Sequence, residues 1–291
     1  MKVVLFCGGL GVRLRDYSDA IPKPMVRIGN RPILWHIMKY YAHFGHKDFI
    51  LCLGHMGEAI KDYFLHYDEW VSNDFVMTSG GRDVEMLNSD IDDWKITFVD
   101  TGLKSSVGER LKAVEAHLAG EEVFLANYSD GLTDLWLPTY VERFLATDSI
   151  ASFLAVRSPQ SFHITTTGED GSVSEVTPIG ESDIWINGGF FVFKQEVFSY
   201  INEGEDLVSE PFARLIKDDK LFAHQYEGFW EAMDTFKDKQ LLDALYETNH
   251  KAPWEIWKIP PEPQADVLPG SASGPAQSDG VVDSDEGKAS T

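Results

Sequence analysis

The chain has few cysteines and no long apolar run. Its 291 residues include two cysteines, Cys7 and Cys52. Both lie in apolar, strand-like runs, so we interpret them as buried reduced thiols, which excludes a disulfide scaffold. No uninterrupted apolar stretch reaches about 18 residues, the length that crosses a bilayer. The sequence also begins without a cationic leader followed by an apolar core. We therefore expect a cytoplasmic protein with no membrane partner.

Basic residues are scarce as well. Lys and Arg number 25 against 47 Asp and Glu, which gives a formal charge of −22 at pH 7. Proteins that bind nucleic acids usually carry a basic stripe, so this balance excludes a general nucleic-acid partner. An anionic substrate would have to be held by a local cationic site.

A change of composition divides the chain into a body and a tail. Residues 260–291 are rich in Pro, Gly, Ser, Ala and Asp and contain few large apolar residues. We predict that 260–291 is a disordered acidic tail. The body, 1–259, is long enough to bury one large core without metal or disulfides. We divide it into a first half of about 1–150 and a second half, 151–259.

The body alternates strand-like runs with helical patterns, and its second half is richer in strands. The predicted strands are Val3–Phe6, Phe49–Leu53, Lys95–Val99, Val123–Ala126, Ala151–Val156, Ser172–Val176, Ile184–Phe193 and Leu221–Tyr226. Helices are predicted from Pro32, over Glu58–Phe64 and Gly108–Leu118, and near Ser209–Lys217 and Lys237–Glu247. This order favours an α/β, three-layer αβα Rossmann-like fold with a mixed, mainly parallel central sheet and a small strand-rich portion. In such sheets the ligand crevice lies beyond the carboxyl ends of the strands.

A glycine-rich turn follows the first predicted strand. It reads Gly8-Gly9-Leu10-Gly11-Val12-Arg13-Leu14, and Lys23 follows between two prolines. Glycines let the main chain approach an anion closely, and successive N–H groups can converge on phosphate oxygens. An Arg fork and a Lys point charge suit a polyphosphate. The turn therefore predicts a phosphate-binding loop.

Other interpretations of this turn stay open on the residues alone. Dinucleotide folds use a different spacing, Gly-x-Gly-x-x-Gly, and the Gly-Lys-Ser/Thr ending of a P-loop is missing here. A strand-to-helix turn that only needs small residues would look similar.

Further motifs carry a resemblance to a known family. They are Lys23-Pro24-Met25, the run from Pro32 to Met38, Val99-Asp100-Thr101-Gly102, Arg110-Leu111-Lys112, the run from Ile186 to Val192, Met233-Asp234-Thr235 and Ala252-Pro253-Trp254. With the glycine turn, the chain resembles the sugar-phosphate nucleotidyltransferases, and within them the glucose-1-phosphate cytidylyltransferases. The resemblance implies a Mg²⁺-dependent enzyme that joins a nucleoside monophosphate from an NTP, CTP above all, to a phosphorylated acceptor and releases pyrophosphate.

The resemblance also assigns roles to individual residues. It implies metal ligands at Asp130 and Asp234 and catalytic roles for Arg13, Lys23 and Asp130. The nucleotide-binding residues that it implies are Phe6, Gly8, Gly9, Leu10, Gly11, Val12, Arg13, Lys23, Ser105, Arg110 and Ser129. Trp185 and Asn187 would contact the acceptor, and relatives of this kind form homo-oligomers. On the residues alone, Asp130 could be a turn residue, and Arg110 a charge on a solvated helix face.

The acceptor side departs from the family pattern. Where related enzymes carry Glu-Lys-Pro, with a Lys that meets the acceptor's phosphate, this chain has Glu175-Val176-Thr177-Pro178. Arg157 and Lys194 are candidates to replace that cation by their place in the sequence. Val12 and Ser129 also stand where the family has Thr and Gly. Three hypotheses follow: a cytidylyltransferase with an unusual acceptor such as another sugar, a cyclitol phosphate or a phosphonate; the reaction on glucose 1-phosphate; and a nucleotide-binding regulatory or scaffold protein without turnover.

Overall fold

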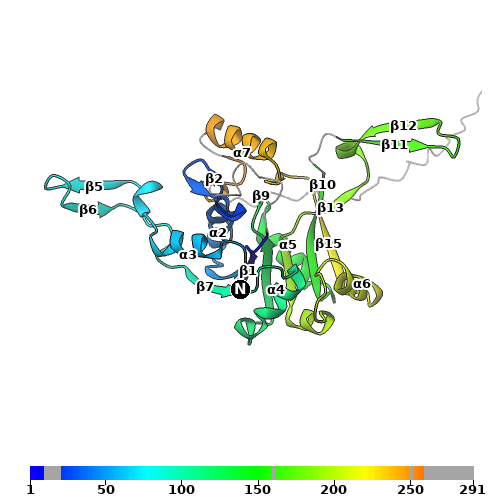
Figure 1. Cartoon of the computed structure of the whole chain (residues 1–291), viewed down its shortest axis with the longest axis horizontal. Helices are drawn as coiled ribbons and strands as arrows, with labels where there is room; N and C mark the ends of the chain where they lie inside the picture. The colour runs from blue at the N-terminus through cyan, green and yellow to red at the C-terminus, as the bar shows by residue number, and fades with distance from the viewer. Residues whose placement is uncertain (10–20, 159–161, 250–251, 259–291) are drawn as a thin grey trace, which may run out of the picture. The chain divides into compact units, whose positions relative to one another are not determined.

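A central sheet organises the part of the chain that the structure describes (Figure 1). The computed structural model describes residues 1–9, 21–158, 162–249 and 252–258. Within them, eight strands form this sheet in the order β13-β10-β14-β8-β1-β4-β7, with β15 paired to β10. Their bounds are β1 Lys2–Phe6, β4 Asp48–Leu53, β7 Lys95–Asp100, β8 Val123–Tyr128, β10 Ala151–Arg157, β13 Trp185–Asn187, β14 Phe191–Lys194 and β15 Leu221–Tyr226.

The direction of the strands matches the mixed sheet that the sequence predicts. β1 pairs in parallel with β4 and β8, β4 with β7, and β10 with β15. β14 is antiparallel to both β8 and β10. Since β8 and β10 both run against β14, their carboxyl ends lie at the same edge of the sheet, together with that of β1.

Helices cover the two faces of the sheet. Successive residues of β1 alternate between two buried clusters, because side chains of a strand point to opposite faces: Val3 and Leu5 belong to one cluster, Val4 and Phe6 to the other. The first cluster contains side chains of α2, α3, α5 and α7, and the second those of α4 and α6. The helices are α2 Ile33–His43, α3 Gly57–Leu65, α4 Val107–Ala113, α5 Leu137–Leu145, α6 Glu210–Lys217 and α7 Phe236–Asn249. The three-layer α/β prediction is therefore confirmed.

Some predicted boundaries differ from the structure. The run Ile184–Phe193 is two strands, β13 and β14, because Gly189 (φ 78°) and Phe190 (φ 49°) adopt left-handed backbone between them. A Cβ on Gly189 would lie 2.6 Å from Asn127 Oδ1, which accepts a hydrogen bond from Phe190 N. The predicted helix Gly108–Leu118 is α4 followed by a separate 3-10 helix, Glu115–Leu118, and Pro32 precedes α2 rather than opening it.

Short pairs of strands form four further sheets of two strands each in the described residues. They are β2 Arg27–Ile28 with β3 Arg31–Pro32, β5 Phe75–Thr78 with β6 Asp83–Met86, β9 Gly131–Thr133 with β16 Trp230–Ala232, and β11 His163–Thr167 with β12 Val173–Pro178. The remaining 3-10 helices are η2 Lys23–Met25, η3 Glu69–Val71, η5 Ile179–Glu181, η6 Gln195–Tyr200 and η7 Ile256–Lys258.

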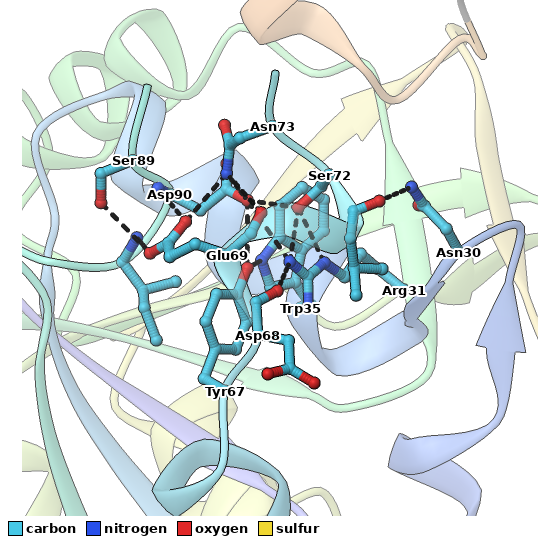
Figure 2. A network of polar contacts seen from close by, with 12 residues as sticks. Asn30, Arg31, Trp35, Tyr67, Asp68, Glu69, Ser72, Asn73, Ser89 and Asp90 are labelled. Carbon is cyan, nitrogen blue, oxygen red and sulfur yellow. Dashed lines mark hydrogen bonds and ion pairs between the residues drawn. The ribbon is translucent and has the colours of Figure 1, made fainter. Parts of the chain in front are cut away.

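A buried polar network fixes the segment that carries the β5–β6 hairpin to α2 (Figure 2). Arg31, whose side chain is 2% exposed, donates to Ser72 Oγ (2.9 Å) and to the carbonyl oxygen of Asp68 (2.7 Å). Ser72 Oγ in turn donates to Asp90 Oδ2 (2.5 Å), and Lys39 Nζ donates to Asp90 Oδ1 (2.9 Å). We name these side chains, Arg31, Lys39, Ser72 and Asp90, the Arg31 network.

Candidate active site

A cavity of about 460 Å³ opens at the carboxyl ends of β1 and β8. Nine residues that the sequence assigned to a site line it: Phe6, Gly8, Gly9, Lys23, Ser105, Arg110, Ser129, Asp130 and Asp234. Leu10, Gly11, Val12 and Arg13 lie outside the described residues. The fold thus brings together residues from five separate segments of the chain, as expected at the carboxyl edge of an open sheet.

Two carboxylates share one ammonium group in this cavity. Lys23 Nζ donates to Asp130 Oδ2 at 2.5 Å and to Asp234 Oδ1 at 2.7 Å. The Lys23 side chain is 14% exposed, and those of Asp130 and Asp234 are 26% and 39% exposed. Burial acts to lower the pKa of Lys23, but the charges and hydrogen bonds of Asp130 and Asp234 outweigh it, and the pKa is raised. The ammonium is therefore held in its charged form.

A small strand pair explains why the two aspartates meet. Asp130 lies between β8 and β9, and Asp234 follows β16 by one residue. β9 and β16 are antiparallel, with Gly131 opposite Ala232, and Met233 N donates to the Asp130 carbonyl at 2.9 Å. Lys23 enters from η2, where Pro24 and Met25 are buried and hold the backbone. The site thus rests on main-chain pairing, which positions both carboxylates without help from a ligand.

Arg110 is a buried residue of the cavity wall, so the alternative of a solvated helix-face charge is wrong. Its side chain faces inward from α4 and the residue is 4% exposed. Nη2 donates to the Gly8 carbonyl (3.0 Å), and Nη1 donates to the Leu53 carbonyl (3.1 Å) and to Thr101 Oγ1 (2.7 Å). One guanidinium therefore ties together the ends of β1, β4 and β7.

The first glycine of the turn makes room for this guanidinium. A Cβ on Gly8 would lie 2.0 Å from Arg110 Nη1. Ser129 Oγ donates to the Phe6 carbonyl at 2.8 Å, and Ser105 Oγ donates to the Thr101 carbonyl at 2.5 Å. These contacts fix the main chain around the cavity. The roles in nucleotide binding stay predictions.

The predicted acceptor residues, Trp185 and Asn187, are not among the residues that line the cavity. Asn187 Oδ1 accepts from Gly189 N at 2.9 Å. Asn187 also lies within hydrogen-bonding reach of Tyr128, a lining residue whose pKa burial raises to about 12. Trp185 packs against Arg157, whose Cζ is 4.4 Å from the indole ring centre. The sequence did not single out Tyr128 or Asp206, which also line the cavity; the position of Tyr128 directly before Ser129 was a usable signal, whereas Asp206 had none.

The two candidate replacement cations lie at different ends of the sheet. Arg157 ends β10, at the same edge as Asp130. Lys194 is paired with Val123, the first residue of β8, at the opposite edge, and its Nζ donates to the Thr147 carbonyl at 3.3 Å. Lys194 is therefore wrong as a candidate, because the antiparallel direction of β14 carries its last residue away from the site.

The sequence of this chain is similar to those of known proteins. A profile described as "Nucleotidyl transferase" matches residues 2–251. The chain is 37% identical over 259 residues to the "Probable glucose-1-phosphate cytidylyltransferase" of Bacillus subtilis, covering 88% of this chain and 100% of that protein. It is 39% identical over 261 residues to the "Glucose-1-phosphate cytidylyltransferase" of Salmonella typhimurium, covering 89% and 100%. The chain belongs to the nucleotidyl transferase family.

Solved structures agree on the fold. A putative glucose-1-phosphate thymidylyltransferase from Bacillus anthracis superposes with a TM-score of 0.62 at 18% identity, covering 85% of this chain and 96% of that one. A UDP-glucose pyrophosphorylase from Acinetobacter baumanii has a TM-score of 0.62 at 17% identity, covering 89% and 97%. Among the described residues, no helix is long and apolar enough to span a bilayer.

Proposed function

We propose that this chain transfers the cytidylyl group of CTP to a sugar 1-phosphate of the glucose type, or to a related phosphorylated acceptor, and releases pyrophosphate. The observation that carries this proposal is the convergence of Lys23, Asp130 and Asp234 on the cavity that Gly8 and Gly9 also line. The similarity to two glucose-1-phosphate cytidylyltransferases over nearly the whole body supports the choice of base and acceptor.

The reaction needs charge neutralisation more than proton transfer. The acceptor's phosphate is already an anion, so an oxygen of that phosphate attacks the α-phosphorus of the nucleotide and pyrophosphate leaves on the opposite side. Lys23 would stand against the charge that develops on the α-phosphate. The main-chain N–H groups of Gly8 and Gly9 would contact the nucleotide. Catalysis in this site is positioning together with electrostatics.

The aspartates fit a divalent cation. One oxygen of Asp130 and one of Asp234 already converge on a single positive centre, at 2.5 and 2.7 Å. Carboxylate oxygens with substrate phosphates are the ligands that Mg²⁺ takes in such sites. Bound there, Mg²⁺ would neutralise phosphate charge and orient the leaving pyrophosphate. Asp130 and Asp234 would hold it.

The test is a screen for pyrophosphate release. CTP, UTP, dTTP, ATP and GTP are each combined with glucose 1-phosphate, other sugar 1-phosphates, a cyclitol phosphate and a phosphonate in the presence of Mg²⁺. We expect the fastest release with CTP and one of these acceptors. Tight CTP binding without release from any pair would contradict the proposal and favour the regulatory alternative.

On the acceptor side, we propose that Arg157 supplies the cation that the Glu175-Val176-Thr177-Pro178 segment lacks. Arg157 is 30% exposed, lies at the carboxyl edge of the sheet and stacks on Trp185. We expect Arg157→Met to raise the KM for the acceptor at least tenfold and to leave the KM for CTP unchanged. Lys194→Met is the matched control and should change neither constant. An unchanged acceptor KM in Arg157→Met would refute this assignment.

We also propose a cytoplasmic homo-oligomer with a first half that binds nucleotide and a second half that binds acceptor. The β5–β6 hairpin supports self-association. Residues opposite one another in an antiparallel pair share a face, and here one face consists of Phe75 with Met86 and Met77 with Val84. Phe75, Met77 and Val84 are 42%, 61% and 55% exposed. An apolar face of this kind on a two-stranded hairpin, which is marginally stable by itself, marks an interaction surface.

The mass in solution tests self-association through this face. Met77→Glu places a charge on the apolar face, and Val76→Glu places the same charge on the opposite face, where Val76 is paired with Glu85. Light scattering after size exclusion should show multimers for the wild type and for Val76→Glu, and a smaller species for Met77→Glu. A monomeric wild type would exclude the oligomer.

A further inference from the structure

The ammonium of Lys23 lies where a cation bound by both aspartates would lie. It is 2.5 Å from Asp130 Oδ2 and 2.7 Å from Asp234 Oδ1, and both contacts come from one nitrogen atom. In the part of the chain that the structure describes, no group of three or more His, Cys, Asp or Glu side chains could hold a metal ion. Among these residues, the cavity offers a metal the carboxylates of Asp130 and Asp234, both already engaged by a positive charge.

We infer that Lys23 occupies the cation position of the nucleotide-free protein, so that a divalent metal binds only together with the triphosphate. This inference rests on the proposed function, because the triphosphate is the ligand that would complete the metal's coordination. It assigns Lys23 a positioning role before the reaction, in addition to its proposed role against the α-phosphate.

Coordination and charge both favour such an exchange. Mg²⁺ requires six ligands at about 2.0–2.1 Å, and two carboxylates leave most positions to water or to substrate oxygens. A metal at that distance from both aspartate oxygens would lie within a few ångströms of the ammonium, and like charges so close repel strongly in a partly buried site. A triphosphate changes both the coordination and the charge balance, since its oxygens can ligate the metal and accept hydrogen bonds from the ammonium at the same time.

The structure permits Lys23 to move without rearranging the fold. Its backbone is anchored, because the neighbouring Pro24 and Met25 are buried. The Lys side chain has four rotatable bonds, and the aspartate side chains it would leave are 26% and 39% exposed. The exchange therefore requires a rotation of one side chain within the cavity.

Binding of Mn²⁺ to the full chain without nucleotide tests the inference, with the resonance of free Mn²⁺ in electron paramagnetic resonance as the readout. We expect weak binding by the wild type and at least tenfold tighter binding by Lys23→Met. Lys95→Met is the matched control, because it removes the same charge from an exposed ion pair with Asp48, and it should bind as weakly as the wild type. Adding Asp234→Asn to Lys23→Met should abolish the gain.

Two outcomes would overturn the inference: wild-type protein that binds Mn²⁺ as tightly as Lys23→Met, or a folded Lys23→Met variant with no gain. Lys23→Gln, which keeps a polar end without charge, is a second variant if Lys23→Met does not fold. If Lys23→Met binds Mn²⁺ more tightly but the wild type releases no pyrophosphate with any substrate pair, this inference stands and the proposed function is wrong. Normal turnover by the wild type with no gain in Lys23→Met would remove this inference alone.

Discussion

Two clusters in this protein combine lysine or arginine with aspartate, and they differ in how their carboxylates are satisfied. In the cavity, Asp130 and Asp234 share the single ammonium of Lys23. Asp90 of the Arg31 network accepts from Lys39 at 2.9 Å. It also accepts from Ser72, Tyr67 and Asn73, at 2.5–3.1 Å (Figure 2). The Asp90 side chain is 7% exposed, whereas Asp234 is 39% exposed.

The difference separates a structural ion cluster from one that can exchange partners. Burial acts to raise the pKa of Asp90, but hydrogen bonds from Ser72 and Lys39 outweigh it, and the pKa is lowered. Separating a buried carboxylate from this many donors would leave its charge uncompensated, so we expect Asp90 to keep its partners. The aspartates of the cavity share one ammonium and their side chains are 26% and 39% exposed, so we expect that a ligand can replace the ammonium. Variants in the two clusters should therefore affect different properties.

The largest effect is expected from Lys23→Met, which removes the cation of the cavity. Turnover with CTP and the best acceptor should fall about 10³-fold, because a group that stabilises developing charge in a preorganised site typically contributes 10²–10³ or more. The free energy of unfolding should change little. Initial rates of pyrophosphate release and urea unfolding measure the two quantities. Near-normal turnover would show that Lys23 has no catalytic role. The two clusters would then not differ in function.

Arg31→Met should do the reverse. It leaves the carbonyl of Asp68 and the hydroxyl of Ser72 without their buried donor, and breaking a buried ionic network costs about 3–5 kcal/mol. We expect the free energy of unfolding to fall by about 4 kcal/mol and turnover per folded molecule to stay within twofold. Lys95→Met, in an ion pair whose lysine side chain is 70% exposed, should change stability by less than about 1 kcal/mol. A loss of turnover in folded Arg31→Met would mean that the network also controls the site.

The sequence predicted the buried strands well, because each is an apolar run with a clear start. The spacing of Asp130 and Asp234 in the sequence did not by itself predict that they meet. Their contact depends on the β9–β16 ladder, and both strands are only three residues long, too short to show a period. The resemblance to a family supplied what spacing alone could not.

Other errors have similar physical reasons. The β5–β6 hairpin was missed because Phe75–Thr78 is exposed on both faces, so no buried face imposes a clean alternation. Lys194 was misplaced because strand direction is invisible in a local pattern. The burial of Arg110 depends on three separate strand ends, whose oxygens accept hydrogen bonds from its guanidinium.

Glu231 is a buried carboxylate whose pKa is raised, whereas that of Asp90 is lowered. Burial, followed by the nearby Asp238, raises the pKa of Glu231 from 4.5 to about 7. Between these values the folded protein holds a proton that the unfolded chain has lost, so stability falls as pH rises. Glu231→Gln should be more stable than the wild type, by a margin that grows by up to about 3 kcal/mol from pH 4 to pH 8. Urea unfolding at several pH values measures it, and a constant difference would show that Glu231 ionises normally in the folded state.

The smallest effect is expected at Arg110, which is as buried as Arg31 but lies on the cavity wall. Arg110→Lys keeps the charge but replaces the planar guanidinium, whose two terminal nitrogens reach the Gly8 and Leu53 carbonyls, with a single ammonium nitrogen. A lost hydrogen bond of this kind costs about 1–1.5 kcal/mol, and the main chain at Gly8 would shift with it. We expect the KM for CTP to rise about tenfold and kcat to change less than threefold, as steady-state rates would show. A fall in stability with an unchanged KM would place Arg110 in the same class as Arg31, because its role would then be to hold the strand ends and nothing more.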